Sequence, residues 1–526
     1  MSESETPVLS QYFSDSENKA IVDQEGNQVA NNINSKEEPN VCRLFSKTPS
    51  VLKDPTAAFF DSIGTSASAN TGIINDLGLS NAIEDNYNAR LASGSEIDRR
   101  RDAWIPTERT RQCLIAYATA AAGTYFPERD QLTMPGVILE EELGDCVGDA
   151  VSMCLGEAEA SQRRILTAND VTQDERGLRE LVQAGSYRAA INLTARLLNI
   201  YGQGKGRSGF ASKHSPRSLQ LWFTRIALLI KIKSYSIAET EAEQFGELDK
   251  PDLFYQFYPE MYGGRSGSIA SFSFRLLLGE LPMHCSKTKE SLTKLFNLLA
   301  TIKQILKNLR GELCEDGTPA EISAADRADS IKLWSCRESR IMHSIINCAL
   351  VQKDYELATN LLEQLCDRDE TPQDSLLSAL GRLYLQMGDV SAAEMCFNKA
   401  RSLRNTPENF RELVDRGLIA VAQNAFTEAY LFFEKASELQ PNNVMVLNNM
   451  GVCLLYSGQL KEAIGVLESG ITLNPVQGLH ESLVLNLCTL YDMESSKGRL
   501  KKFALLRQIS RYHADAPTTI LEKLYG

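Results

Sequence analysis

The chain has 526 residues, of which 43% are hydrophobic and 23% are charged, a composition typical of a globular protein. Its 68 acidic residues outnumber the 55 basic ones and give a net charge of −13, which argues against a nucleic-acid surface and favours protein partners. The 12 cysteines include no Cys-x-x-Cys pair, so a reducing, cytoplasmic setting is expected. No apolar run approaches the ~18 residues of a membrane span, which leaves peripheral membrane association at most.

Residues 1–98 are predicted to be a disordered tail, because they are rich in Ser, Asn, Asp and Glu and contain no Trp. The stretch 14–17, Ser-Asp-Ser-Glu, is an acidic context in which phosphorylation would add negative charge. One apolar island is either a short docking motif or a residual cluster without a partner, and it consists of Leu52, Pro55, Phe59, Phe60 and Ile63.

Residues 99–175 are predicted to be a helical lead-in, with Thr107 as a candidate N-cap and a second helical stretch over 145–160. Residues 176–248 show the spacing of degenerate, repeat-like helix pairs. Between these pairs, the glycine-rich segment 201–209 has no Ser or Thr after its Gly-Lys. We therefore interpret it as a flexible connector and not as a phosphate loop.

Residues 249–275 interrupt the helical pattern with a stretch rich in aromatic residues, Pro and Gly. This composition does not suit a repeat helix, so the segment is either a loop packed across the helices or an exposed contact surface. On the second alternative, the candidate partner-facing residues are Tyr255, Tyr258, Tyr262 and Arg265.

Residues 276–372 are predicted to be helical again, with a long amphipathic segment over 288–309 and a helix over 324–351 that carries Trp334. Downstream of that helix a degenerate repeat is indicated by Asp354, Ala358, Leu362 and Leu365.

A 34-residue repeat fills the last third of the chain. Leu413, Gly417, Ala429 and Phe433 are matched 34 residues later by Leu447, Gly451, Ala463 and Leu467, and 36 residues earlier by Leu377, Gly381, Ala393 and Phe397. This is the tetratricopeptide-repeat (TPR) pattern. It predicts repeats over 373–408, 409–442 and 443–476, followed by capping helices over 477–526. The predicted fold is therefore all-α, an α-solenoid of TPR helix pairs with an elongated body behind the disordered tail.

Small residues in the repeats predict where paired helices approach closely. Gly381, Gly417 and Gly451 fall within first helices, where Gly costs about 1 kcal/mol relative to Ala unless close packing requires it. On the second helices the residues predicted to pack the pairs are Ala393, Ala429, Phe433 and Ala463.

No constellation in the sequence predicts chemistry. The five histidines are scattered, no Gly-x-Ser-x-Gly lies between a strand and a helix, and no second pair of ligands accompanies His284 and Cys285. We expect no catalytic residue, no metal site and no cofactor, and hence a protein that is not an enzyme.

The groove of a TPR array is lined by first-helix positions, and arrays that clamp a chaperone C-terminus place Lys, Asn and Arg there. Here only Arg382 and Asn448 are of that type, and the other predicted positions are mostly apolar. We therefore expect an apolar peptide, a partner helix or a loop of the same chain in the groove, with Arg382 and Asn448 as further candidate partner-facing residues.

Four segments carry a resemblance to a known family: 202–204, 218–223, the aromatic stretch 251–275 and 448–456. Over roughly residues 100–515 the chain resembles the subunit 12 family of TRAPP, the transport protein particle of metazoans. Relatives in this family have longer N-terminal tails, and no site residues transfer because the family has no catalytic motif.

The resemblance implies a non-catalytic scaffold of the TRAPP III form, a tethering assembly and Rab guanine-nucleotide exchange factor in endoplasmic reticulum-to-Golgi transport and autophagy. It implies contacts with the large TRAPP III-specific subunits, an indirect relation to a Rab GTPase, and a peripheral location at the endoplasmic reticulum-Golgi intermediate compartment and Golgi. The repeat alone also fits a peptide-binding scaffold of another assembly, for example one associated with the cell cycle or the kinetochore.

Overall fold

The computed structural model describes residues 96–120, 124–125, 127–319, 322–368, 373–404, 409–494 and 498–525, with side chains from residue 99 onward. The predicted tail, with its acidic stretch 14–17 and its apolar island, lies outside the described residues except at its end. Residues 96–98 belong to the first helix, α5 (Glu96–Asp102), so helical structure begins slightly earlier than predicted.

The described chain is all-α, as predicted, and its only β-type contacts are the isolated bridges of Val137 with Lys205 and Phe254 with Ser268. Short 3-10 turns are η1 (Arg129–Gln131), η2 (Pro251–Leu253) and η3 (Tyr255–Phe257). The helices up to the repeats are α6 (Glu108–Thr119), α7 (Cys146–Leu155), α8 (Glu157–Ala160), α9 (Glu175–Gln183), α10 (Tyr187–Ile200), α11 (Pro216–Lys231), α12 (Tyr235–Glu243), α13 (Pro259–Tyr262), α14 (Phe272–His284), α15 (Thr288–Arg310), α16 (Ala324–Gln352) and α17 (Tyr355–Cys366).

The protein is an α-solenoid of TPR helix pairs. The pairs in the three predicted repeats are α18 (Gln373–Met387) with α19 (Val390–Ser402), α20 (Phe410–Ala422) with α21 (Phe426–Leu439), and α22 (Val444–Tyr456) with α23 (Leu460–Leu473). After them come α24 (Pro475–Gly478), α25 (Glu481–Glu494), α26 (Gly498–Tyr512) and α27 (Thr518–Tyr525).

The turn inside each repeat depends on one residue with a left-handed backbone. Gly388 and Gly458 have φ values of 86° and 79°, and Asn424 takes the equivalent place with 59°. Gly adopts this conformation without strain, and Asn tolerates it better than most residues. The side chains of Asn409 and Asn443 cap the first helices of the second and third repeats by accepting from backbone N–H groups.

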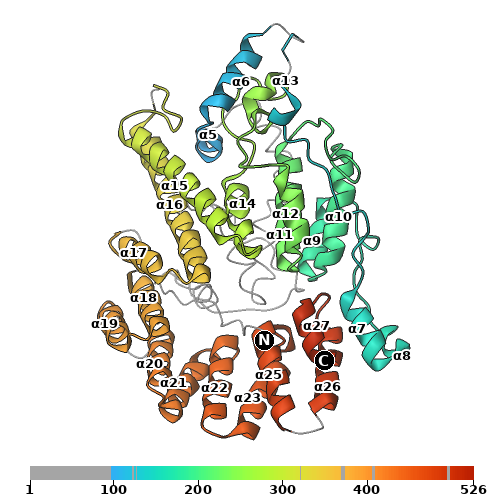
Figure 1. The fold of residues 1–526 in the computed structure, drawn as a ribbon, viewed down its shortest axis with the longest axis vertical. Coiled ribbons are helices and arrows are strands. Elements are labelled where there is room, and N and C mark those ends of the chain that lie inside the picture. The colour runs from blue at the N-terminus through green and yellow to red at the C-terminus, as the bar shows by residue number, and fades with distance from the viewer. Residues whose placement is uncertain are drawn as a thin grey trace, which may run out of the picture.

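The ends of the solenoid meet. Figure 1 shows the helices following one another around a closed path, on which α7 lies beside the red C-terminal helices. Both α26 and α27 contact α7 directly. The elongated body expected from the sequence is therefore wrong. The helices of the predicted lead-in lie in two places: α5 and α6 are near the aromatic segment, and α7 and α8 cover the C-terminal end of the array.

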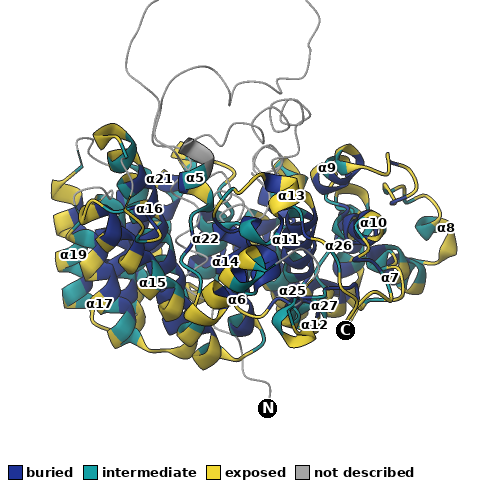
Figure 2. Cartoon of the chain, turned by 90° about the horizontal axis from the view of Figure 1, so that it is seen from above, coloured by how far each residue is buried: buried dark blue, intermediate teal, exposed yellow. Residues whose placement is uncertain are grey.

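Buried side chains form three clusters. The largest runs from Trp104 to Leu383 through the N-terminal helix pairs. A second, smaller cluster lies inside the second and third repeats. The third cluster joins Val147 and Val151 of α7 to the C-terminal helices. Figure 2 shows the buried residues within the helix pairs and the exposed ones on their outer faces. Because Val147 and Val151 share a core with residues more than 300 positions away, the closure is hydrophobic as well as polar.

Candidate functional site

The glycines of the repeats lie against large side chains of the paired helix. A Cβ built on Gly381 would come within 2.5 Å of Cε1 of Phe397, and one on Gly417 within 2.7 Å of Cε1 of Phe433. Gly451 faces a smaller residue, since its Cβ would be 3.0 Å from Cδ2 of Leu467. Fully buried alanines lie on the second helices, namely Ala393, Ala429 and Ala463. These contacts set the spacing of the helices inside each repeat.

The aromatic segment is packed, not exposed. Tyr255, Tyr258 and Tyr262 are 2%, 7% and 8% exposed, so they do not form the exposed partner surface considered as one alternative from the sequence. The guanidinium of Arg265 lies 4.3 Å from the centre of the Tyr255 ring and forms an ion pair with Asp102. Loss of solvent contact is favourable for rings of this size, which explains why the segment folds inward across the helices.

Tyr258 fixes the aromatic segment to the rest of the core. Its hydroxyl donates to the carbonyl oxygen of Asp252 at 3.0 Å and accepts from the backbone N–H of His214 at 3.2 Å. Burial raises the pKa of Tyr258 well above its usual value, so the phenol stays protonated and available as a donor.

A buried polar cluster next to Tyr258 resembles catalytic machinery in its residue types. Thr133 Oγ1 donates to Asp252 Oδ2 at 2.6 Å and must therefore accept from Nε2 of His214, which lies 2.5 Å away. Gln203 donates to Nδ1 of the same ring at 3.4 Å, in keeping with that tautomer. His214 is fully buried, and Asp252 and Thr133 are nearly so. The cluster holds loops together.

The same cluster corrects the interpretation of segment 201–209 as a flexible connector. Gln203 is fully buried and accepts from Nε1 of Trp222 at 2.8 Å, and Val137 N donates to the carbonyl oxygen of Gly204. The flanking glycines have positive φ, 71° at Gly202 and 68° at Gly206, which allows the backbone to turn around this side chain.

The two clamp-type residues on the first helices are engaged within the chain. Arg382 forms an ion pair with Asp415 of the next repeat at 3.1 Å, and Arg404 reaches the same carboxylate at 3.5 Å. Asn448 accepts from Nδ2 of Asn486 at 2.7 Å and is half-buried. Arg382 therefore joins successive repeats. Six residues were predicted to face a partner. Among them, only Asn448 both keeps substantial solvent contact and lacks a charged partner among the described residues.

Arg163 holds the two ends of the solenoid together, and sequence reasoning missed it. Its Nη1 donates to the carbonyl oxygens of Ser510 and His513 at 2.5 and 2.9 Å, and its Nη2 to that of Ala514 at 2.5 Å. Its Nε donates to Asp145 at 2.7 Å, and the side chain is 2% exposed. The guanidinium thus caps the C-terminal end of α26 with its five-donor fork.

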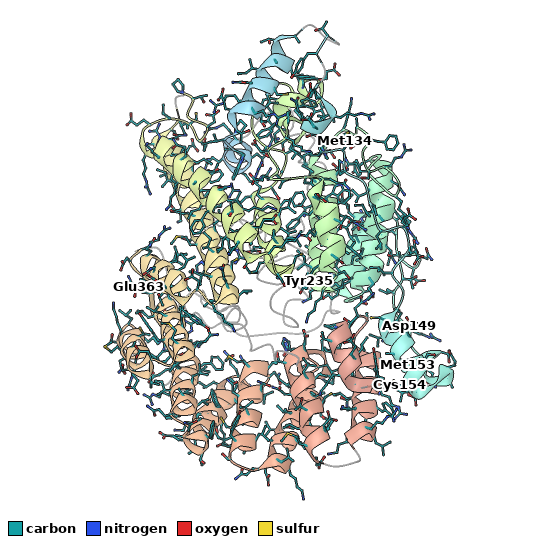
Figure 3. The ribbon with its side chains drawn as sticks, in the orientation of Figure 1. Met134, Asp149, Met153, Cys154, Tyr235 and Glu363 are labelled. Carbon is teal, nitrogen blue, oxygen red and sulfur yellow. The ribbon has the colours of Figure 1, made fainter. Side chains whose placement is uncertain are left out.

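Further polar contacts cross the same closure. Arg188 pairs with Asp515 at 3.4 Å, and its backbone N–H donates to that carboxylate. Burial raises the pKa of Asp515, although Arg188 and these hydrogen bonds act in the opposite direction. Lys233 pairs with Glu481 of α25. Figure 3 labels Asp149, Met153 and Cys154 on α7 at this side of the molecule.

Cysteines in the core behave as small apolar residues. Burial raises the pKa of Cys453 and of Cys488 to about 11, so both remain thiols at neutral pH.

Among the residues that the structure describes, no group of three His, Cys, Asp or Glu side chains is arranged to hold a metal ion. In the same part of the chain, no helix is long and apolar enough to cross a membrane.

Comparison with known proteins agrees with the helix pairs. Models of the tetratricopeptide repeat match residues 375–406 and 432–465. The chain is a tetratricopeptide-repeat protein. Over 440 residues, which are 83% of its length, it is homologous to trafficking protein particle complex subunit 12, with 39% identity to the protein of Mus musculus and 40% to that of Homo sapiens.

The chain spans 55% and 60% of the length of these two relatives. Among solved structures, a tetratricopeptide repeat protein from Parabacteroides merdae is 11% identical, with a TM-score of 0.33, and the match covers 59% of this chain and 98% of that one.

Proposed function

We propose that this chain is a non-catalytic scaffold subunit of a TRAPP complex. The observation that carries the proposal is its 39–40% identity, over 440 residues, to proteins named as subunit 12 of that complex. The solenoid supports the proposal because stacked helix pairs offer long surfaces to other proteins. The buried Thr133, His214 and Asp252 support a non-catalytic role, since they lie inside the core and Thr133 bonds to both of the other side chains.

The finer proposal concerns the TRAPP III form, the vesicle-tethering and Rab guanine-nucleotide exchange assembly of endoplasmic reticulum-to-Golgi transport and autophagy. In this proposal the chain joins the large TRAPP III-specific subunits, and other subunits act on the Rab GTPase. Its location is the cytoplasm, peripherally at the endoplasmic reticulum-Golgi intermediate compartment and Golgi. Membrane contact is made through the complex.

For the contact with another subunit we propose the face of α22 that carries Asn448. Val452 and Leu455 lie on the same helix one and two turns further on and are half-buried, so the face combines apolar area with an amide. This composition suits a partner helix or an apolar peptide.

The test is affinity purification of the tagged full chain from cells, with the co-purifying proteins identified by mass spectrometry. Recovery of the other TRAPP subunits in near-equal amounts is the expected result, including the large TRAPP III-specific ones. A different stable set of partners, for example a cell-cycle assembly, would overturn the proposal and leave only the repeat fold in common with the relatives.

The contact face is tested in the same experiment with Asn448→Arg, which adds bulk and charge at a half-buried position. Thr472→Arg is the matched control, because Thr472 is exposed on the second helix of the same repeat. Loss of the subunits with Asn448→Arg alone, at unchanged melting temperature, is expected. Equal recovery with both variants would exclude this face.

A further inference from the structure

A cleft lies between the second and third repeats, where the turn after α20 meets the end of α22. Its volume is about 430 Å³, which is within the range of about 300–1,000 Å³ typical of ligand pockets. One wall is formed by residues 424–428 and the other by Tyr456 and Ser457, because α21 and α22 pack side by side (Figure 1). We call this site the repeat cleft.

Two aromatic rings form the apolar part of the repeat cleft. Phe426 and Tyr456 are stacked, with ring centroids 4.8 Å apart and an angle of 16° between the ring planes. Phe426 covers one side of the Tyr456 ring, yet the Tyr456 side chain is still 68% exposed, so the rest of the ring faces solvent. The face of an aromatic ring attracts cations, and a tyrosine is among the better residues for this contact.

Glu428 supplies the charge of the repeat cleft. It is the only charged residue that lines the cleft, and it is exposed. In the described part of the chain, no basic side chain pairs with Glu428 and no cation lies over either ring. A carboxylate and a ring face both favour positive charge, so the cleft is complementary to a cation and disfavours an acidic group.

Elsewhere in this chain the same combination of ring and carboxylate holds a basic side chain. The guanidinium of Arg265 lies 4.3 Å from the centre of the Tyr255 ring and is paired with Asp102. A second example, in the C-terminal helices, joins Lys501, Tyr491 and Glu494. In both cases the cation belongs to the chain itself. The repeat cleft has the ring and the carboxylate, but none of the described residues supplies the cation.

We propose that the repeat cleft binds an arginine side chain of another TRAPP subunit, with its guanidinium over the Tyr456 ring and paired with Glu428. Arginine fits better than lysine because a planar guanidinium stacks on a ring and bonds to a carboxylate at the same time. The cleft continues the contact face of α22, since Tyr456 follows Val452 by one turn. The identity of the partner rests on the proposed function.

The test uses the tagged full chain in cells, with the co-purifying subunits quantified by mass spectrometry. Glu428→Arg should lower their recovery about fivefold, because two like charges then meet in the cleft. Tyr456→Leu should lower it about threefold, since Leu keeps the apolar bulk without a π face, whereas Tyr456→Phe keeps the face and should bind like the parent. Both positions are exposed, so the melting temperature should hardly change.

Glu438→Arg is the matched control for the charge reversal. Glu438 is exposed on the same helix, α21, but does not line the repeat cleft. This variant makes the same change in net charge as Glu428→Arg and should leave the recovery of the subunits unchanged.

A crosslink and an exchange of charges identify the occupant. Ser457→benzoylphenylalanine places a photo-crosslinking residue in the wall of the cleft and leaves Tyr456 and Glu428 in place. The crosslinked peptide of the partner subunit should contain an arginine. Changing that arginine to Glu should lower recovery as Glu428→Arg does, and the two changes together should restore it, because the ion pair then forms with its charges exchanged.

The outcomes that would overturn the proposal are distinct. Equal recovery with Tyr456→Leu and Tyr456→Phe would show that no cation lies on the ring. Failure of the exchanged charges to restore recovery would show that Glu428 meets no arginine of the partner. Crosslinks within the chain, or between two copies of it, would assign the cleft to those contacts. TRAPP subunits recovered equally with every variant would reject the cleft alone, whereas their absence from the parent chain would reject the proposed function as well.

Discussion

At the scale of single residues, the glycines inside the repeats have no room for a side chain. Gly417→Ala should lower the free energy of unfolding by about 1–3 kcal/mol, because its Cβ would overlap the Phe433 ring, and overpacking has this cost. Gly451→Ala should cost less, since the Leu467 methyl at 3.0 Å can move aside. Urea unfolding followed by circular dichroism measures both.

Gly465→Ala is the control for these substitutions. Gly465 is also within a helix, α23, but a Cβ there would meet nothing within 4 Å. Ala is better than Gly in a helix interior by about 1 kcal/mol, so this variant should be stabilised. The opposite order of the three variants would show that the helices of the repeats are not held at these contacts.

A second residue-scale prediction concerns His513 at the closure. Burial lowers the pKa of His513, and Arg163 beside it acts in the same direction. The unfolded chain, with a histidine pKa of about 6.5, therefore binds more protons than the folded one under acid conditions, and stability falls as the pH drops below that value. His513→Gln should reduce the loss of melting temperature between pH 7.5 and 5.5. Burial also lowers the pKa of His284 and His480, which contribute to the loss in the same direction.

At the scale of elements, the aromatic segment should behave as core. Tyr258→Ala should cost about 3–5 kcal/mol of stability, the usual price of removing a buried aromatic ring. Tyr258→Phe should cost about 1–3 kcal/mol, because the N–H of His214 and the carbonyl of Asp252 lose their partner. Thermal unfolding distinguishes these values from the near-zero change expected of a surface residue.

The helix pairs were predictable from the sequence because each is specified locally. Spacing, caps and turn residues such as Asn424 and Gly458 lie within a few positions of the helices that they define. The fate of the aromatic segment was not predictable in the same way. The hydroxyl of Tyr258 contacts Asp252 nearby but also His214, which is 44 residues away in the sequence. In addition, an aromatic residue suits a core and an interface equally well, so its presence alone does not predict burial.

At the scale of the whole molecule, closure of the solenoid should depend on Arg163 and Val151. Arg163→Ala leaves three carbonyl oxygens near the end of α26 without this donor, at about 1–3 kcal/mol for each buried group left unpaired. Val151→Asp places a charge in the apolar part of the contact. The double variant should show a larger radius of gyration by small-angle X-ray scattering at unchanged helix content.

Arg507→Ala is the matched control for the closure. Arg507 also joins the two ends, by an ion pair with Glu159, but its side chain is 54% exposed. An exposed pair contributes little, so this variant should keep the dimensions of the parent protein. An equal expansion of both variants, or of neither, would contradict a closure held by the buried guanidinium.

The sequence by itself determined the helices, the three TPR units and the relationship to the subunit 12 family, because periodicity and turn residues act over distances of a few turns. Only the tertiary structure decided that the solenoid closes, that Arg163 and Asp515 hold the closure, and that the aromatic tyrosines are buried. Arg163 meets Ser510 across 347 positions of the chain. No local pattern records such a contact, since it arises from the curvature accumulated over all the intervening helix pairs.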